Sequence, residues 1–236
     1  MFAEDRERDT NYERLPVIRV TCEEKCACAG WEEIRRRLAL RMPEQGVMVV
    51  ECYPGVTLAQ IRGGLEPLGW DQIICSDTCA LDPHALDDLL KEELTDDKVF
   101  GHMTKRRLAD VFVPQRLESA RRACKTGRVL IYGVGASLVH PGDVQIMADL
   151  TRWEIQLRYR RGMMNWRTAQ CNASRLGKLK RGYFAEWRWA DGAKEALLAT
   201  MDFYLDMTRD DAPAMVEGAS YRNALMQVVR STSSFR

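Results

Sequence analysis

The sequence lacks any uninterrupted apolar run of the roughly 18 residues that a membrane-spanning helix needs. Its first segment, MFAEDRERDTNYERL, is charged and has no apolar stretch of the kind that secretion signals carry. A charge excess is lacking too, because the formal net charge is +1 over 236 residues. A broad nucleic-acid-binding surface would need a basic balance. We therefore expect a cytoplasmic protein with neither membrane nor nucleic acid as a partner.

Histidine is scarce. The chain has three histidines, His84, His102 and His140, and they are widely separated. There is no His-x-His or His-Glu-x-x-His pair for a catalytic metal and no Gly-x-Ser-x-Gly nucleophile motif. Metal-assisted isomerisation and serine- or cysteine-type hydrolysis therefore receive little support, and we expect no metal site from histidine.

Cysteine, by contrast, occurs eight times. Because no secretion signal precedes them, we interpret the cysteines as reduced thiols. The segment TCEEKCAC brings Cys22, Cys26 and Cys28 close together, and Cys75 and Cys79 are spaced for one helical turn. Zinc sites combine two such groups, so a metal site built from these thiols is the alternative to thiols in an N-terminal extension.

Apolar residues make up 46% of the chain, enough to build a full core. Short apolar runs alternate with segments of helical periodicity. Strands are predicted at 46–52, 70–77, 128–134, 144–150 and, as the last one, 201–207. Helices are predicted at 30–42, 57–68 (ending at the Gly63–Gly64 pair), 82–94, the second half of 105–127, 151–166 and 219–231. Residues 1–30 and 95–103 read as irregular, 172–183 as a very basic segment, and 183–191 as a strand or loop.

This alternation predicts an α/β fold with three layers, a mostly parallel sheet covered by helices on both faces. Ligands of such sheets bind outside the carboxyl ends of the strands. The loops to search are therefore 52–57, 77–82, 133–142 and 149–152.

The loop YPGVT, from Tyr53 to Thr57, lies between a predicted strand and a predicted helix. That layout is typical of a phosphate-binding loop, whose backbone N–H groups point at an anion. Here the loop is short and lacks the lysine of the GxxxxGK[ST] motif. Two interpretations stay open: a tight turn at Gly55 with Thr57 capping the helix, or a residual phosphate site built from backbone N–H groups.

Gly133 and Gly135 in GVGASL form a second small-residue loop after a strand. Small residues let a ligand approach the backbone, and they equally let a helix pack close to the sheet. Both interpretations stay open.

Arginines are concentrated on the predicted helix at 151–166, where Arg152, Arg158 and Arg161 lie close to the ligand edge of the sheet. Arginine forks bind phosphate and carboxylate in a bidentate manner. A solvated face, partly neutralised by Glu154, is the alternative. Asp77 and Asp149 lie at or near strand ends, which suits acid/base or magnesium chemistry. Asp77 is the candidate catalytic carboxylate, and a helix or turn cap is the alternative role for it.

The phrases VVECYPGVTLAQI, IICSDT, VLIYGVGASL and IMADLTRWEIQLRYRRG resemble, in this order, the motifs of P-loop kinases of the uridine kinase and phosphoribulokinase type. The resemblance covers roughly residues 46–206. It implies a P-loop NTPase or kinase-like core with a degenerate phosphate loop, preceded by the polar extension 1–30 and followed by an appendage at 207–236, all in one domain. It also implies a nucleotide, with Mg²⁺, as the cofactor to consider.

The phrases VVECYPGV, LTDDKVFG, YGVGASL, DLTRWEIQLRYRRG and KRGYFAEWR are similar to the kinase-like region ahead of the cupin domain in long bacterial class I mannose-6-phosphate isomerase-like proteins. Isomerase chemistry in that family belongs to the cupin, and this chain carries no His-x-His metal motif. The resemblance implies a domain that binds a small phosphorylated molecule, a sugar phosphate or nucleotide. A separate cupin isomerase or a second copy of the chain is the implied partner. Unorthodox phosphoryl transfer is the alternative.

Overall fold

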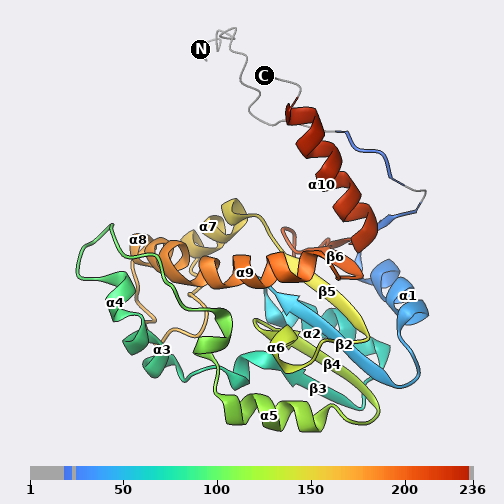
Figure 1. The fold of residues 1–236 in the computed structure, drawn as a ribbon, viewed down its shortest axis with the longest axis horizontal. Helices are drawn as coiled ribbons and strands as arrows, with labels where there is room; N and C mark the ends of the chain where they lie inside the picture. The colour runs from blue at the N-terminus through green and yellow to red at the C-terminus, as the bar shows by residue number, and fades with distance from the viewer. Residues whose placement is uncertain (1–18, 23–24, 234–236) are drawn as a thin grey trace, which may run out of the picture.

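The computed structural model describes residues 19–22 and 25–233 (Figure 1). Within these residues one sheet contains seven strands. In spatial order they are β1 (Ala27–Ala29), β7 (Ala214–Glu217), β6 (Phe203–Asp206), β5 (Val144–Asp149), β2 (Gly46–Cys52), β4 (Arg128–Gly133) and β3 (Gln72–Cys75).

Five neighbouring strands, β6, β5, β2, β4 and β3, run parallel, whereas β7 and β1 extend the sheet in antiparallel pairings. The central strand β2 is buried along nearly its whole length. Such a strand must be apolar on both faces, which explains why its sequence GVMVVEC reads as a continuous run rather than an alternating one. The predicted α/β class with a mostly parallel sheet is confirmed.

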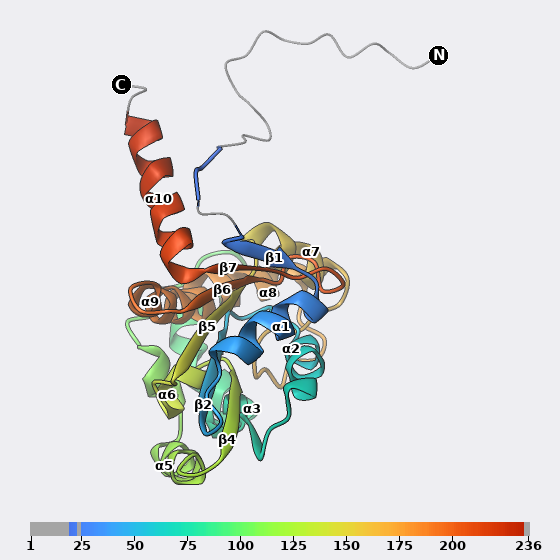
Figure 2. The ribbon, with the colours of Figure 1, turned by 90° about the vertical axis from the view of Figure 1, so that its right-hand side faces the viewer.

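Helices cover both faces of the sheet (Figure 2). Met48 and Val50 of β2 face one apolar cluster, and the intervening residues Val47 and Val49 face the other. The first cluster is covered by α1 (Trp31–Arg41), α2 (Leu58–Leu65) and α7 (Arg152–Arg160). The second is covered by α3 (Pro83–Leu89), α5 (Pro114–Ala123) and α6 (Ala136–Val139).

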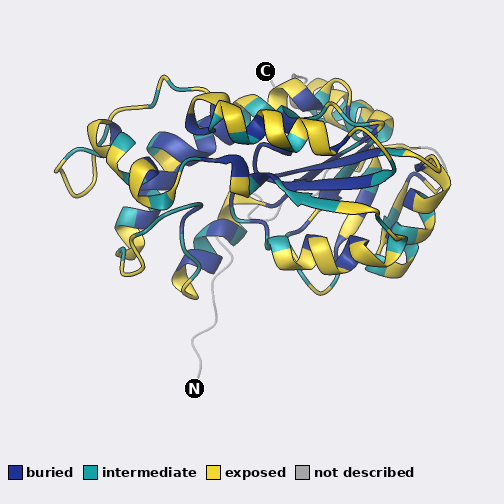
Figure 3. Cartoon of the chain, turned by 90° about the horizontal axis from the view of Figure 1, so that it is seen from below, coloured by how far each residue is buried: buried dark blue, intermediate teal, exposed yellow. Residues whose placement is uncertain are grey.

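Helix α9 (Trp187–Leu198) contributes to both clusters, through Trp187 on one side and Trp189 on the other. It follows α8 (Arg175–Arg181) and a π-helical turn at Gly182–Glu186. The other helices are α4 (Lys91–Leu94), the short 3₁₀ turns Glu66–Leu68, Ser76–Cys79 and Leu108–Val111, and α10 (Gly218–Ser233), which stands away from the sheet in Figures 1 and 2. In Figure 3 the strands are dark and the outer faces of the helices are light, so the core follows the sheet.

Helix α2 does not end at the Gly63–Gly64 pair, as predicted from the sequence, but continues to Leu65. The reason is packing: any side chain at Gly64 would run into the ring of Trp31 on α1. Gly64 therefore serves the contact between two helices rather than a helix stop. Gly63 faces open space.

Three other element predictions were wrong. Residues 27–29, placed in an irregular extension, form the edge strand β1, which pairs with β7. The segment 183–191, read as strand or loop, is helical. The strand at 203–206 is not the last one, because β7 follows it and pairs with it.

The prediction that all cysteines are reduced thiols was also wrong for one pair. Cys22 and Cys26 form a disulfide, with Cα atoms 6.5 Å apart, within the span of about 4.4–6.8 Å that a disulfide bridges. Cys28, Cys75 and Cys79 are free. No group of three or more cysteine, histidine or acidic residues in the described part of the chain is arranged to hold a metal ion. In that same part, no helix is long and apolar enough to cross a membrane.

Candidate functional site

A polar cleft of about 310 Å³ lies at the carboxyl ends of β2, β5 and β6. β2 and β5 are neighbours in the sheet. Strand β3, which follows β2 in the chain, lies on the β2 side of this pair, whereas β6, which follows β5, lies on the β5 side. Ligands of open α/β sheets bind at such a switch point. The cleft is lined by Tyr53, Asp149, Leu150, Thr151, Arg152, Asp191, Lys194, Tyr204, Asp206 and Thr208.

Asp149, the last residue of β5, is the buried centre of the cleft, with 3% of its surface exposed. Its Oδ1 accepts the N–H of Leu150 at 2.8 Å, and its Oδ2 accepts the hydroxyl of Tyr204 at 2.8 Å. The same Oδ2 forms an ion pair with Nζ of Lys194 on α9. Burial, followed by the nearby charge of Asp149, raises the pKa of Tyr204, so its hydroxyl remains a donor.

A second polar group borders the first. The hydroxyl of Tyr53, directly after β2, donates to Oδ1 of Asp191 at 2.9 Å. The guanidinium of Arg152 forms an ion pair with the same carboxylate and stacks on the ring of Trp187 at 5.4 Å. Burial raises the pKa of Tyr53, which keeps this hydroxyl protonated as well.

The cleft therefore combines two cations, Arg152 and Lys194, with three carboxylates, Asp149, Asp191 and Asp206. Ammonium and guanidinium groups donate to anionic oxygens, and carboxylates accept from hydroxyls. A small ligand that carries both an anionic group and hydroxyl groups matches this set of donors and acceptors.

The loop at Gly55 and Thr57 is a turn held by Arg158. Nη1 of Arg158 donates to the carbonyl of Gly55 at 3.0 Å and to Oγ1 of Thr57 at 3.1 Å. Thr57 makes no capping bond to its own helix and donates instead to Asp210 at 3.1 Å. Gly55 has a φ of +112°, and a side chain there would press on Ile155 at 2.9 Å.

The remaining donors of Arg158 are also engaged. Nε donates to Glu154 at 3.1 Å, and Nη2 donates to the carbonyl of Met207 at 2.8 Å and pairs with Asp210 at 3.1 Å. The side chain of Arg158 is 5% exposed, and protein groups occupy the donors that were expected to contact a phosphate. Arg161 is 62% exposed and pairs with Glu154. Of the three predicted arginines, Arg152 is the one that lines the cleft.

The loop with Gly133 and Gly135 already holds the side-chain carboxyl group of Glu51. The carboxylate of Glu51 accepts the N–H of Gly135 at 2.6 Å, and both the N–H and the hydroxyl of Ser137, at 2.9 and 2.7 Å. Glu51 is 2% exposed, and its burial raises the pKa of its carboxyl group. The backbone N–H groups that a ligand could approach in this loop are therefore already bound to Glu51.

Asp77 lies outside the polar cleft, at the end of β3. Its Oδ1 accepts the N–H of Val134 at 2.9 Å, and its Oδ2 accepts the indole N–H of Trp166 at 2.7 Å. Burial raises the pKa of Asp77. The predicted site residues thus fall into three groups, apart from the exposed Arg161. Tyr53 and Arg152 lie in the cleft, and Gly55 and Thr57 lie in the turn held by Arg158. The glycine loop is occupied by Glu51 and Asp77.

Sequence reasoning missed Lys194, Asp191 and Tyr204. Lys194 and Asp191 lie on α9, whose first residues read as a strand or loop, so they could not be placed near the sheet. Tyr204 was within a predicted strand but was not singled out. Glu51 had a readable signal, since it is the one charged residue in the buried strand β2.

A family model described as a domain of unknown function (DUF8485) matches residues 30–230 of the chain. The match begins just before α1 and ends within α10, so it covers the sheet without β1 and includes every residue that lines the polar cleft. No curated protein matches the chain.

Proposed function

The chain belongs to the family described as a domain of unknown function (DUF8485), and we propose that its polar cleft binds a small phosphorylated polyol, such as a sugar phosphate. The observation that carries the proposal is the pairing of Lys194 and Arg152 with Asp149 and Asp191 at the carboxyl ends of neighbouring parallel strands. Phosphate oxygens would accept from the two cations, and sugar hydroxyls would donate to the carboxylates.

The size of the cleft favours a sugar phosphate over a nucleotide. Its volume of about 310 Å³ is at the lower end of the roughly 300–1,000 Å³ typical of ligand pockets. Its walls are polar apart from Leu150 and the rings of Tyr53 and Tyr204. A nucleotide would need additional apolar surface for its base.

The proposal includes a degenerate P-loop kinase-like fold. The first parallel strand, β2, lies in the centre, flanked by the third and fourth, with the second and fifth outside them. P-loop kinases share this strand order, which supports the resemblance. In this scheme Lys194 of α9 supplies the cation that the loop lacks, and Arg158 holds the shortened loop against the segment after β6. A cupin isomerase stays the proposed partner.

Binding without phosphoryl transfer is the version we favour. Transfer would need an acid/base group beside the bound phosphate. Asp77, the carboxylate predicted for that role, does not line the cleft, and both its oxygens accept from protein N–H groups. Asp149 does line the cleft, but both its oxygens are engaged by the N–H of Leu150, the hydroxyl of Tyr204 and the ammonium of Lys194.

Isothermal titration calorimetry with hexose phosphates, the unphosphorylated hexoses, inorganic phosphate and ATP tests the proposal. We expect the hexose phosphates to bind most tightly. Lys194→Met should weaken their binding about 10–100-fold, the range for a lost hydrogen bond to a charged group. Lys125→Met is the matched control, because Lys125 is exposed and outside the cleft.

Lys194 also pairs with Asp149, so the melting temperature of each variant is measured without ligand. The ligand-induced shift is then read relative to that baseline. Equal hexose phosphate affinity in wild type and Lys194→Met would exclude the cleft, and absence of binding by every phosphorylated probe would reject the proposal.

A further inference from the structure

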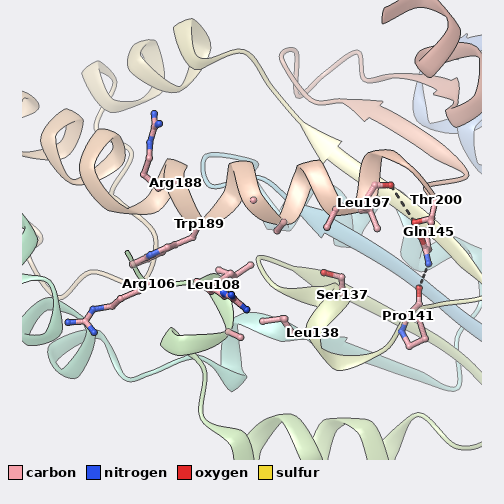
Figure 4. Close-up of a pocket in the computed structure, with 15 residues that line it drawn as sticks. Arg106, Leu108, Ser137, Leu138, Pro141, Gln145, Arg188, Trp189, Leu197 and Thr200 are labelled. Carbon is pink, nitrogen blue, oxygen red and sulfur yellow. Dashed lines mark hydrogen bonds between the residues drawn. The ribbon is translucent and has the colours of Figure 1, made fainter. Parts of the chain in front are cut away.

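A second cavity, of about 550 Å³, lies between α9, the turn Leu108–Val111 and the segment from α6 to the start of β5 (Figure 4). Its walls are mainly apolar and include Leu108, Leu138 and Leu197. In Figure 4 Trp189 stands near one end and Thr200 near the other. None of its lining residues lines the polar cleft, so the two cavities are separate sites.

At the end with Thr200, the polar side chains hydrogen-bond within the protein. The hydroxyl of Thr200 donates to Oε1 of Gln145 at 2.8 Å, and Nε2 of Gln145 donates to the carbonyl of Pro141 at 2.7 Å (Figure 4). These polar groups are satisfied within the protein. A ligand therefore gains its polar contacts at the other end.

All the charge along this cavity is positive. Arg106, Arg107 and Arg188 line it, and no acidic side chain does. Arg106 pairs with Glu93 at 3.0 Å, and the guanidinium of Arg188 stacks on Tyr183 at 5.3 Å. The side chain of Arg107, an exposed residue, makes no ion pair with any described residue.

Trp189 adds a buried donor without an acceptor. The residue is 2% exposed, and its indole N–H has no hydrogen-bond partner among the described residues. Its ring packs edge-on against Trp166. The nitrogen itself is fully buried, so the N–H does not face the cavity, and a ligand there would contact the ring of Trp189.

We propose that this cavity binds a linear carboxylate with an apolar chain, a ligand of the fatty-acid class. The chain would lie along the leucine wall, where Ala193 and Ala196 of α9 leave room for it. The carboxylate would lie beside Arg107, whose guanidinium can form a bidentate pair with it. A planar carboxylate suits the fork of one guanidinium.

Calorimetry with octanoate as the probe tests this inference, with octanol and octylamine as matched chains that carry a neutral or a positive head. We expect octanoate to bind at least tenfold more tightly than either. Arg107→Gln should weaken octanoate binding about 10–100-fold, the range for a lost hydrogen bond to a charged group. Arg122→Gln, at an exposed arginine outside the cavity, should leave it unchanged.

Ala193→Trp fills the cavity from a partly exposed position and should abolish octanoate binding. Circular dichroism confirms that each variant is folded at the temperature of titration. Unchanged octanoate affinity in Ala193→Trp, or equal affinity for octanoate and octylamine, would overturn the inference. The inference would also be overturned if analytical sedimentation showed a dimer of the wild type that Ala193→Trp converts to a monomer. The cavity would then be an interface between two copies of the chain. Lys194→Met should leave octanoate binding intact, which separates this result from that for the polar cleft.

Discussion

Replacing Arg158 by methionine should destabilise the fold rather than only weaken a ligand. The side chain of Arg158 is 5% exposed. Methionine retains an apolar stem but lacks the guanidinium, which joins three segments: the loop at Gly55, helix α7 through Glu154, and the chain after β6 through Met207. The carboxylates of Glu154 and Asp210 would each lose a cationic partner.

The magnitude follows from the exposure of those two partners. Removing one member of a buried ion pair lowers stability by about 3–5 kcal/mol. Asp210 is 36% exposed and can be rehydrated, whereas Glu154 is 14% exposed. The lower end of the range, about 3 kcal/mol, is therefore expected. For a chain of this size, it corresponds to a fall in melting temperature of about 6–12 °C.

Urea unfolding followed by circular dichroism measures this change in the free energy of unfolding. Arg161→Met is the matched control from the end of the same helix. Its side chain is 62% exposed, and its loss should change stability by less than about 1 kcal/mol. An unfolding free energy for Arg158→Met within 1 kcal/mol of wild type, together with lost hexose phosphate binding, would refute our assignment and make Arg158 a ligand residue.

Two further predictions concern packing and titration. Gly63→Ala places a methyl group in open space and should raise the free energy of unfolding by about 0.5–1 kcal/mol. Gly64→Ala places the methyl group against the Trp31 ring and should lower the free energy of unfolding by about 1–3 kcal/mol. Equal urea midpoints for the two variants would contradict the contact between Gly64 and Trp31. Burial raises the pKa of Asp77. In the pH window between the unfolded and the folded pKa, the native state therefore keeps the carboxyl proton that the unfolded chain has lost. The stability of wild type relative to Asp77→Asn should therefore fall as pH rises through that window, and a difference independent of pH would disprove it.

The central strands were predictable because burial on both faces leaves a direct mark on the sequence. Strands β2 and β4 are runs of mostly apolar residues, and no other element type fits their length and flanking turns. The start of helix α9 gave the opposite signal. Trp187 and Trp189 are two positions apart, pack into different apolar clusters and flank Arg188, so this segment alternates as a strand does, although the helix as a whole is amphipathic.

The candidate site was predictable only where it follows a predicted strand. Tyr53 and Arg152 were found because they come just after β2 and β5. The contacts that decide the chemistry join residues far apart in the chain, such as Glu51 with Gly135 and Lys194 with Asp149. Local patterns cannot show that a glycine loop is filled by a distant carboxylate, or that a lysine from a later helix enters the cleft.

The pairing of β1 with β7 has a consequence for synthesis on the ribosome. Ala27 pairs with Val216, so the first described strand has no partner until nearly 190 further residues have been made. At about 5–20 residues per second, the delay is roughly ten to forty seconds. The parallel strands can assemble during this time, whereas the edge of the sheet at β6 stays open until β7 emerges. A translational pause before residue 214 would prolong the lifetime of this open edge, at which nascent chains are most prone to associate with one another.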